Sequence, residues 1–496
     1  MVKRRTGQVP KTQNNEQEKP KIPVKEQPEP VKKTKKDKKK YQPEFSIFRL
    51  DQIFRYHGFS KFRITFADIA LFTIVTLISA YTHFIDFGEP NRVVFDEVYF
   101  GNFTNYYHRK KYFFDIHPPL GKELLYFGSV ISGYKADLKF YSIDSDFPND
   151  NIKLLRFWPS LTGTLITPVV YLMLRICDVS YMWATAGAIL PALDNMLIVE
   201  SRFVLIDAYL WFFAALSSLM CACAVRFFKH NILFAILSGI AVGATTSVKF
   251  TGAGVSIGVV IAFFMNYNFI DAFVMSFHAA VSGIVVFIGS FYVHFLILTN
   301  PGPGCDFNRD ICRAMEKHEL SPIVATFTLI KTMLGSNFAI NVEHPYASKW
   351  WQWPLQLGKG NWLWFHENKE LWTVGTPAIW YFAFFMQFVS LFRVKSDRFV
   401  RGSIWIFVTY LISYLPFSLI KRVMWNYHYA IPLIFSIEMS CVSLSSFNNK
   451  FVKYFVPFVV IVAALINYLI LLPVTIGSPI NSAEYYRKFF FNNWHY

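Results

Sequence analysis

Long apolar runs separated by short polar turns fill most of the 496-residue chain. Each run is about 20 residues long, the length that a helix needs to cross the hydrocarbon core of a bilayer. The pattern predicts eleven transmembrane helices, at about residues 66–87, 154–175, 181–196, 203–225, 231–248, 251–267, 272–298, 374–392, 402–420, 428–446 and 452–473. Residues 181–250 also allow other divisions, so the boundaries there stay open. We therefore expect an all-α polytopic membrane protein.

Polar segments divide the chain into a tail, an approach and one transmembrane domain. Residues 1–45 are rich in Lys, Pro, Gln and Glu and hold few apolar side chains, so we expect a disordered basic tail. Residues 46–65 predict an amphipathic approach to the first helix, and residues 66–496 predict the transmembrane domain. Within this domain, two long loops are expected at about 88–153 and 300–372.

The distribution of positive charge predicts the orientation of the chain. Under the eleven-helix division, the basic tail, Arg175, Arg226, Arg393 and Lys450 all fall on one side of the membrane. Short loops rich in Lys and Arg stay in the cytosol, so this side is expected to be cytosolic. The two long loops and the C-terminus are then expected on the opposite side.

Composition excludes a soluble enzyme and gives little support to nucleic-acid binding or metal chemistry. The chain is 53% hydrophobic and 19% aromatic, and only 17% of its residues are charged. Much of the net charge of +16 comes from the tail, whose lysine run has no interleaved aromatic residues, so we expect contact with anionic lipid and none with nucleic acid. Cys305 and Cys312 could form a disulfide in a lumenal loop, but their surroundings lack the ligands of a zinc site.

An adjacent acid pair, Asp96 and Glu97, follows the first apolar run almost directly. A tyrosine-rich stretch comes next, and then His117-Pro118-Pro119, in which proline restrains the histidine before it to an extended geometry. Carboxylates just outside a membrane span are placed to act on a substrate at the bilayer surface. The alternative is that the pair consists of ordinary solvated loop charges.

Several ionisable residues lie at the ends of expected spans, where charge is costly and a functional role is the first hypothesis. Under the predicted topology Arg156, Glu200, Arg202 and Arg422 share the membrane face of the acid pair. Arginine binds phosphate oxygens through two parallel hydrogen bonds, so this set suits a lipid that carries a phosphate group. The alternative is that these long side chains only reach from the bilayer toward water.

Aromatic residues gather in the second long loop and at the start of the tenth expected span. His344, Trp350, Trp353 and His428 lie in these segments. Tryptophan and tyrosine beside polar groups could stack on a sugar or hold an acceptor peptide. The same residues could also form an interfacial aromatic belt, which their composition favours.

Residues 94–101 and 114–122 resemble the first lumenal loop of the protein O-mannosyltransferases, membrane glycosyltransferases of the GT-C class. Further segments are similar to that family in the same order, at residues 154–160, 200–203, 247–249, 289–295, 302–304, 344–354 and 427–429. The resemblance implies a GT-C fold in the endoplasmic reticulum membrane, with the N-terminus cytosolic and the C-terminus lumenal. It also implies dolichyl-phosphate-mannose as donor, and Ser or Thr hydroxyls of secretory proteins as acceptors.

The resemblance also implies roles for single residues. Asp96 is expected to be the general base, Glu97 to shape the acceptor site, and Arg156 to handle the donor. Candidates for binding the donor phosphate or lipid are Arg156, Arg202, Arg422 and His83, the last standing where the family usually carries an arginine. Candidates for binding the acceptor or sugar are His117, Glu200, His344, Trp350, Trp353 and His428. No metal or other cofactor is expected, and the chain is expected to pair with itself or with a paralogue.

The length of the second long loop sets the chain apart from this family, and a glycosylation sequence lies close to the expected site. The second long loop, with about 70 residues, is too short for the β-trefoil (MIR) domain that eukaryotic members usually carry there. Asn102-Phe103-Thr104 is an N-glycosylation sequence, but a glycan so close to Glu97 would crowd the site, so we expect it to stay unmodified. Two other functions stay open: a related GT-C enzyme that moves another polyprenyl-linked sugar to a lipid or glycan, and a transporter or scaffold.

Overall fold

The computed structural model describes residues 64–227, 231–339, 343–481 and 485. The predicted tail, 1–45, and nearly all of the predicted approach, 46–65, lie outside the described residues. The described chain is mostly helical, and a helix occupies each of the eleven expected spans. These helices are α2 (Phe66–Phe84), α5 (Ile152–Ile176), α6 (Tyr181–Ala192) with α7 (Asn195–Ser201), α8 (Asp207–Arg226), α9 (Asn231–Val248), α10 (Ala253–Asn266), α11 (Phe269–Ile297), α14 (Pro377–Ser396), α16 (Ile404–Tyr414), α17 (Ala430–Ser445) and α18 (Val456–Ile476).

The helices differ in how well they meet the length of a bilayer. Among the described residues, seven are long and apolar enough to cross a membrane, or eight if α6 and α7, which meet at 54°, count as one span. Two further apolar stretches, Phe250–Asn266 and Ile404–Leu419, are shorter. The chain is a multi-pass membrane protein, and the number of eleven spans stays a prediction.

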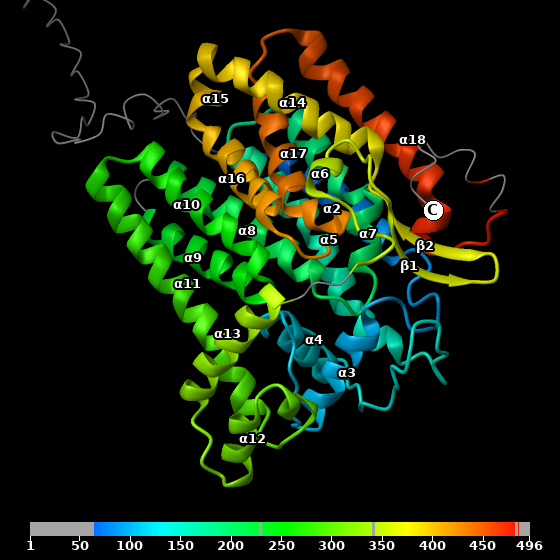
Figure 1. The fold of residues 1–496 in the computed structure, drawn as a ribbon. Helices are drawn as coiled ribbons and strands as arrows, with labels where there is room; N and C mark the ends of the chain where they lie inside the picture. Colours follow the sequence, from blue (N-terminus) through cyan, green and yellow to red (C-terminus); the bar gives the residue numbers. More distant parts are fainter. Residues whose placement is uncertain (1–63, 228–230, 340–342, 482–484, 486–496) are drawn as a thin grey trace, which may run out of the picture. The chain divides into compact units, whose positions relative to one another are not determined.

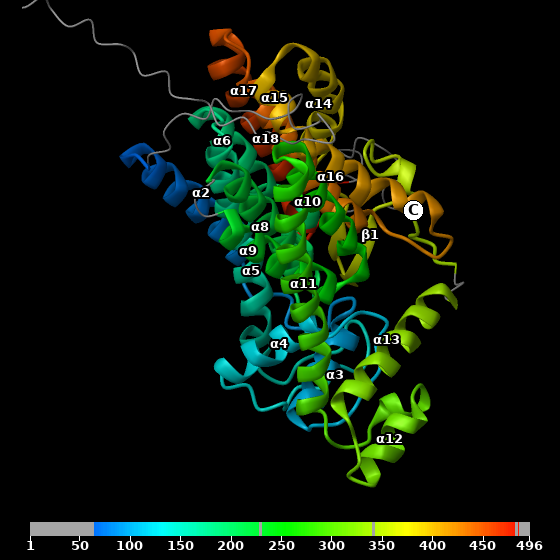
Figure 2. The same cartoon turned by 90° about the vertical axis from the view of Figure 1, so that its left-hand side faces the viewer.

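Helix α8 lies inside the bundle, and α11 lies at its edge (Figures 1 and 2). Most of α8 is buried against α5 and α9, whereas α11 and α18 leave many apolar side chains exposed, as lipid-facing helices do. Helix α9 packs closely on α11 because Gly239 and Gly243 face its backbone; a Cβ atom at Gly239 would lie 2.1 Å from the carbonyl oxygen of Ala279. Such close approach through small residues is typical of helices within membranes.

The two long loops fold into structure that the apolar pattern did not predict. The first contains α3 (Glu97–His108) and α4 (Leu120–Ile131), and the second contains α12 (Arg309–Glu316), α13 (Pro322–Ala339) and the antiparallel hairpin of β1 (Asn361–His366) and β2 (Lys369–Thr373). Cys305 and Cys312 form a disulfide before α13. Helices α3, α4 and α12 lie at the same end of the bundle in both views (Figures 1 and 2). We call this end, which carries residues 85–151, 298–339 and 343–376, the loop face.

The loops hold one another through backbone and aromatic contacts. Lys111 forms an isolated bridge with Asn300, and the backbone N–H of Phe95 donates to the carbonyl oxygen of Leu363 in β1. A buried cluster joins side chains of the first loop, the end of α11 and helices α12 and α13; it includes Tyr107, Tyr112, Phe113, Phe291, Phe295, Ile311 and Leu329. The segment before the acid pair is therefore fixed by the second loop.

Candidate active site

Asp96 stands at the start of α3, and its carboxylate has no hydrogen-bond or ion-pair partner among the residues that the structure describes. Phe95 before it adopts a positive φ of 47°, a left-handed conformation that is unfavourable for a bulky side chain. The bond from Phe95 to Leu363 helps to hold this turn. Asp96 is the N-cap residue of α3, yet its side chain caps no backbone N–H of the helix. A strained turn thus presents a half-buried carboxylate that is available for other partners.

Glu97, the next residue, has the opposite environment. Its carboxylate accepts two hydrogen bonds from Arg156, at 2.8 and 2.7 Å, and one each from the backbone N–H groups of Val94 and Val204. The Glu97 and Arg156 side chains are 0% exposed. Glu97 therefore has no free oxygen that could accept a proton from a substrate, and its contacts favour a structural role.

Arg156 uses its whole guanidinium group inside the protein. Besides Glu97, it donates to the carbonyl oxygens of Gly88, Pro90 and Arg92 at 2.7 Å each. Its guanidinium carbon also lies 4.7 Å from the ring centre of Phe203. This geometry favours positioning of the acid-pair loop by Arg156 over the predicted contact with a donor phosphate.

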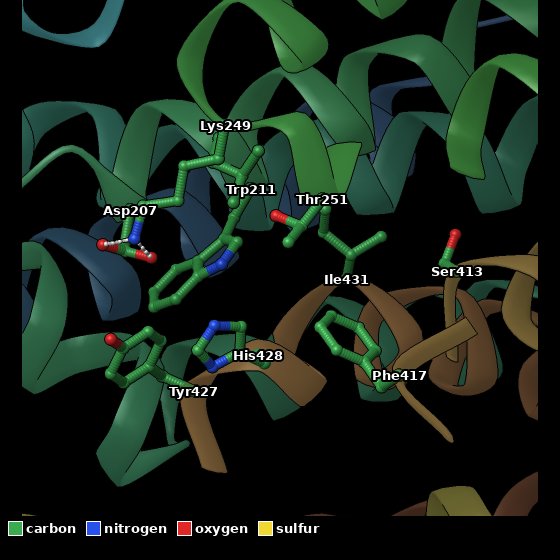
Figure 3. A pocket seen from close by; sticks show the side chains of 10 residues that line it. Asp207, Trp211, Lys249, Thr251, Ser413, Phe417, Tyr427, His428 and Ile431 are labelled. Carbon is green, nitrogen blue, oxygen red and sulfur yellow. Dashed lines mark hydrogen bonds and ion pairs between the residues drawn. The ribbon is translucent and has the colours of Figure 1, made fainter. Parts of the chain in front are cut away.

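A buried ion pair lies close to Asp96. The ammonium of Lys249 donates to both carboxylate oxygens of Asp207, at 2.9 and 2.7 Å, and lies 5.2 Å from the ring centre of Tyr427 (Figure 3). Lys249 and Asp207 are both within electrostatic reach of Asp96. A charge pair of this kind can fix the potential around a neighbouring carboxylate.

This ion pair lines a small cavity of about 10 Å³ between α8, the segment before α10 and the segment before α17. Tyr427 and His428 face the pair across the cavity (Figure 3). The full lining consists of Asp207, Leu210, Trp211, Lys249, Thr251, Ser413, Phe417, Tyr427, His428 and Ile431. It therefore combines charged groups with aromatic surfaces.

The environment of Asp96 raises its pKa to about 7. Burial is the main cause, the charge of Lys249 opposes it, and the carboxylates of Asp207 and Asp115 add to it. A carboxylate with a pKa near neutrality can both accept a proton and be deprotonated again at physiological pH. Asp96 thus has the property expected of a general base.

The His117-Pro118-Pro119 segment is tied down by Lys122. The buried ammonium of Lys122 donates to the Asp115 carboxylate at 2.5 Å and to the carbonyl oxygens of His117 and Pro118 at 2.6 and 3.0 Å. Burial, followed by the charge of Lys249, holds the pKa of His117 well below its usual value. His117 is therefore neutral at neutral pH and suited to hydrogen bonding rather than to charge stabilisation.

Arg422 brings a cation to the same group of residues. Its Nη1 donates to Oδ1 of Asn337 at 2.5 Å, and Nδ2 of Asn337 donates to the carbonyl oxygen of Ile116 at 2.7 Å. Arg422 lies within electrostatic reach of His117 and Tyr427. Asn337, on α13, therefore connects Arg422, a predicted donor-binding residue, to the segment just before His117.

Glu200 is a buried carboxyl group that the structure also places here. It is 1% exposed, and among the described residues neither of its side-chain oxygens has a hydrogen-bond partner. The charges of Asp207, Lys249 and Asp96 act on it. Because buried polar groups normally have partners, Glu200 is the side chain of this group that most needs a further contact.

Arg202 and His83 belong to a separate buried group. Nη2 of Arg202 donates to the carbonyl oxygen of Asp86 at 3.1 Å, and Nδ1 of His83 donates to the carbonyl oxygen of Ser79 at 2.8 Å. The two side chains are within electrostatic reach of each other. Arg202 also lies within electrostatic reach of Arg156, and the described contacts of Arg202 and His83 include neither Asp96 nor Lys249. The predicted donor-binding set is therefore divided between these residues and Arg422.

The predicted aromatic residues form one stack next to the cavity. Trp353 is buried and nearly parallel to His428, with ring centres 6.0 Å apart, and its Nε1 donates to Oγ of Ser348. The ring of Trp350 packs on Tyr414 at 5.5 Å. His344 is exposed and meets the stack through Trp425 at 5.7 Å. Of these residues His428 lines the cavity, whereas Trp353 packs on His428 and does not line it.

The sequence analysis gave no role to several members of the group, notably Lys249, Asp207, Tyr427, Asp115 and Lys122. A signal was present for the first two, because opposite charges in or next to apolar runs must find partners. The sequence could not show that these two pair with each other. Among the described residues, no group of three or more His, Cys, Asp or Glu is placed to hold a metal ion. Independence from metals stays a prediction.

Comparisons with known proteins give consistent matches along the chain. A family model described as "Dolichyl-phosphate-mannose-protein mannosyltransferase" matches residues 73–299, and one described as "C-terminal four TMM region of protein-O-mannosyltransferase" matches residues 324–494. Dolichyl-phosphate-mannose–protein mannosyltransferase 4 of Schizosaccharomyces pombe is 32% identical over 52% of this chain and 36% of its own length. The protein of the same name from Candida albicans is 30% identical over 48% of this chain and 34% of its own length. The chain therefore spans about a third of the length of these relatives.

A solved structure matches more of the chain. In the structure of the S. cerevisiae protein O-mannosyltransferase Pmt1–Pmt2 complex bound to the sugar donor, one chain aligns with a TM-score of 0.78 over 88% of this chain and 93% of that chain. The sequence identity is 17%, so this likeness establishes the fold. The predicted GT-C architecture is confirmed.

Proposed function

Because this chain belongs to the protein O-mannosyltransferase family, we propose that it transfers mannose from dolichyl-phosphate-mannose to Ser or Thr hydroxyls of secretory-pathway proteins. The observation that carries the proposal is the uncommitted carboxylate of Asp96, whose raised pKa of about 7 suits a general base. The charges of Lys249 and Asp207 act on this carboxylate, and those of Lys249 and Arg422 act on His117 in the same loop.

The proposed reaction needs one base and a stabilised leaving group. Asp96 accepts the proton of the acceptor hydroxyl as its oxygen forms a bond to C1 of mannose. The bond between C1 and the phosphate oxygen breaks on the opposite side, so the configuration inverts and dolichyl phosphate leaves with the electron pair. Arg422 is the cation best placed to offset the growing charge on the phosphate, because its contact with Asn337 holds it beside the acid-pair loop.

Glu97 and Arg156 position Asp96 in this proposal. Their buried pair fixes the backbone that leads into the acid pair, since Arg156 also binds the carbonyl oxygens of residues 88, 90 and 92. Glu200 and His428 are left for the sugar or the acceptor. Glu200 has unpartnered oxygens that mannose hydroxyls could satisfy, and His428 lines the cavity.

The family and the charge pattern also suggest where and with what the protein acts. We place it in the endoplasmic reticulum membrane with the loop face lumenal, since the short basic loops lie on the other side. A paralogue is the proposed partner, because the matching solved structure is a complex of two such proteins, Pmt1 and Pmt2. A homodimer is the alternative.

The test is mannosyl transfer in membranes that lack endogenous activity. Radiolabelled dolichyl-phosphate-mannose and a Ser/Thr-rich peptide are supplied to wild-type protein, Asp96→Asn and the matched control Asp150→Asn, an exposed residue of the same loop. We expect label on the peptide with wild type and control, and almost none with Asp96→Asn. Equal transfer by all three removes Asp96 as the base. No transfer by wild type, with each candidate paralogue also present, argues against protein acceptors.

A further inference from the structure

A hollow of about 410 Å³ opens on the loop face between the ends of α3 and α4. Its lining consists of His108, Arg109, Val130, Gly133, Tyr134, Lys135 and Ala136. None of these residues lines the cavity of Figure 3, and none takes part in the proposed reaction. We call this feature the α3–α4 hollow.

The α3–α4 hollow lies beside the start of the membrane helix α5. Nε1 of Trp158, in the second turn of α5, donates to Oγ of Ser132, the residue that ends α4, at 2.8 Å. A Cβ atom at Gly128 of α4 would lie 2.5 Å from the Trp158 ring, so the last turns of α4 rest on this side chain. Tryptophan near the end of a membrane helix settles at the interface between hydrocarbon and headgroups. The turn that follows α4 is therefore at the same level.

One side of α4 exposes apolar side chains beside the hollow. Phe127, Val130 and Ile131 are spaced as i, i+3 and i+4 and share one helix face, and Ile131 is 72% exposed. Phe157 on the neighbouring helix α5 is exposed as well. Such a face is unfavourable in water but favourable among acyl chains, as in helices that lie in the membrane interface.

Two cations without a counter-ion line the hollow. Arg109 makes one long side-chain hydrogen bond, 3.5 Å to the carbonyl oxygen of Ala136, and Lys135 is exposed. Neither forms an ion pair with any residue that the structure describes. Asp137, two residues after Lys135, accepts hydrogen bonds from Asn149 and Asn151.

The remaining polar groups of the hollow are already engaged. Nε2 of His108 is hydrogen-bonded to Oγ of Ser129 at 2.7 Å, and the hydroxyl of Tyr134 donates to Asn105. Burial and the charge of Lys135 lower the pKa of His108, so its ring is neutral at neutral pH. The positive charge of the hollow thus comes from Arg109 and Lys135.

We propose that the α3–α4 hollow binds the headgroup of an anionic phospholipid from the leaflet at the loop face. Arg109 and Lys135 contact the phosphate oxygens, and the acyl chains lie along Phe127, Val130 and Ile131. The charges match an anion, and the adjoining apolar face matches lipid chains, so one phospholipid satisfies both features. This site is independent of mannosyl transfer and does not rest on the proposed function.

The test measures thermal unfolding of the full-length protein in neutral detergent. Phosphatidylserine, phosphatidylcholine or inorganic phosphate is titrated into wild type, into Arg109→Gln/Lys135→Gln and into the control Lys110→Gln/Lys111→Gln. The control removes two exposed charges from the same segment outside the hollow. We expect phosphatidylserine to raise the Tm of wild type and control at concentrations where the other two ligands have little effect. The Arg109/Lys135 variant should need about tenfold more phosphatidylserine, in line with the loss of two phosphate contacts.

Ile131→Ser provides a second, independent variant, which should weaken the response to phosphatidylserine and leave the Tm without lipid unchanged. Equal responses to phosphatidylserine and phosphatidylcholine would overturn the proposal, as would equal responses of the Arg109/Lys135 variant and its control. A different outcome also contradicts it: the Arg109/Lys135 variant has a lower Tm without lipid but responds to lipid as wild type does. In that case the two cations only stabilise the C-terminal ends of α3 and α4, where unpaired carbonyl groups carry partial negative charge.

Discussion

Arg156 and Glu97, 59 residues apart in the chain, form a two-point ion pair with hydrogen bonds of 2.8 and 2.7 Å and no exposure to solvent. The pair includes the residue next to Asp96, and its other hydrogen bonds are to backbone groups of residues 88–94 and 204. An acid pair in the sequence is thus divided by the fold into one available carboxylate and one structural carboxylate.

Removing Arg156 should unfold the site rather than only weaken donor binding. Arg156→Met leaves Glu97 as an uncompensated buried charge, and breaking a buried pair in this way costs about 3–5 kcal/mol. We expect a clear fall in thermal stability and yield, with most of the loss recovered by the double variant Arg156→Met/Glu97→Gln. Stability in detergent checks this. If Arg156→Met keeps wild-type stability and only the KM for the donor rises, Arg156 is a donor ligand after all.

The pH dependence of transfer should report Asp96. Because the base must be ionised and its pKa is about 7, kcat/KM should rise with pH up to about 7 and level off above it. Lys249 lowers the pKa of Asp96, so Lys249→Met should move this rising limb to higher pH. The measurement is a pH–rate profile of both proteins. A limb that stays in place, or a rate that falls as pH rises through 7, contradicts the assignment.

Asn337 should act through Arg422. Asn337→Ala removes the acceptor that holds the Arg422 guanidinium, so we expect the KM for dolichyl-phosphate-mannose to rise several-fold with a smaller change in the KM for peptide. Asn337→Asp retains the acceptor oxygen and should recover donor binding. Steady-state kinetics with each substrate varied in turn separate the two effects. Equal losses for both substrates, or no recovery by Asp, would point to a general structural role.

Asn102 should stay unglycosylated even with the loop face in the lumen. Its Nδ2, the atom that would carry a glycan, donates to the carbonyl oxygens of Val98 and Phe140 at 2.7 and 2.9 Å, and the residue lies within α3. Treatment with an endoglycosidase should therefore leave the mobility of the protein unchanged. The control is Asn151→Thr, which creates an acceptor sequence at exposed Asn149 and should add one glycan. A glycan on Asn102 in the folded protein would mean that α3 forms only after modification.

Much of this site could be predicted because its chemistry is carried by short local motifs. Asp96, His117, Glu200, Arg422 and His428 were all named from the sequence, and the fold brings them within reach of one group of charges. Roles were harder to assign than membership. Arg156 looked like a phosphate ligand because it is an arginine at a membrane end, and nothing local showed that three carbonyl oxygens and Glu97 would engage it fully.

Other features depend on contacts between distant segments. Asp207 and Lys249 are 42 residues apart, and each could have paired with another charge or reached toward water. Helices α3, α4, α12 and α13 lie in segments that hydropathy marks only as polar, since they are held by aromatic packing between the two loops. The α3–α4 hollow likewise exists only because Trp158 supports the end of α4.

The sequence alone determined the membrane bundle and its family, because apolar runs of spanning length have no other stable environment and because the family motifs are contiguous. Tertiary structure decided which charges meet. A buried charge must find a partner, but the sequence does not say which one, and the choice follows from how helices pack and loops close. That choice left Asp96 free, engaged Glu97 with Arg156, and placed Lys249 with Asp207 beside the proposed base.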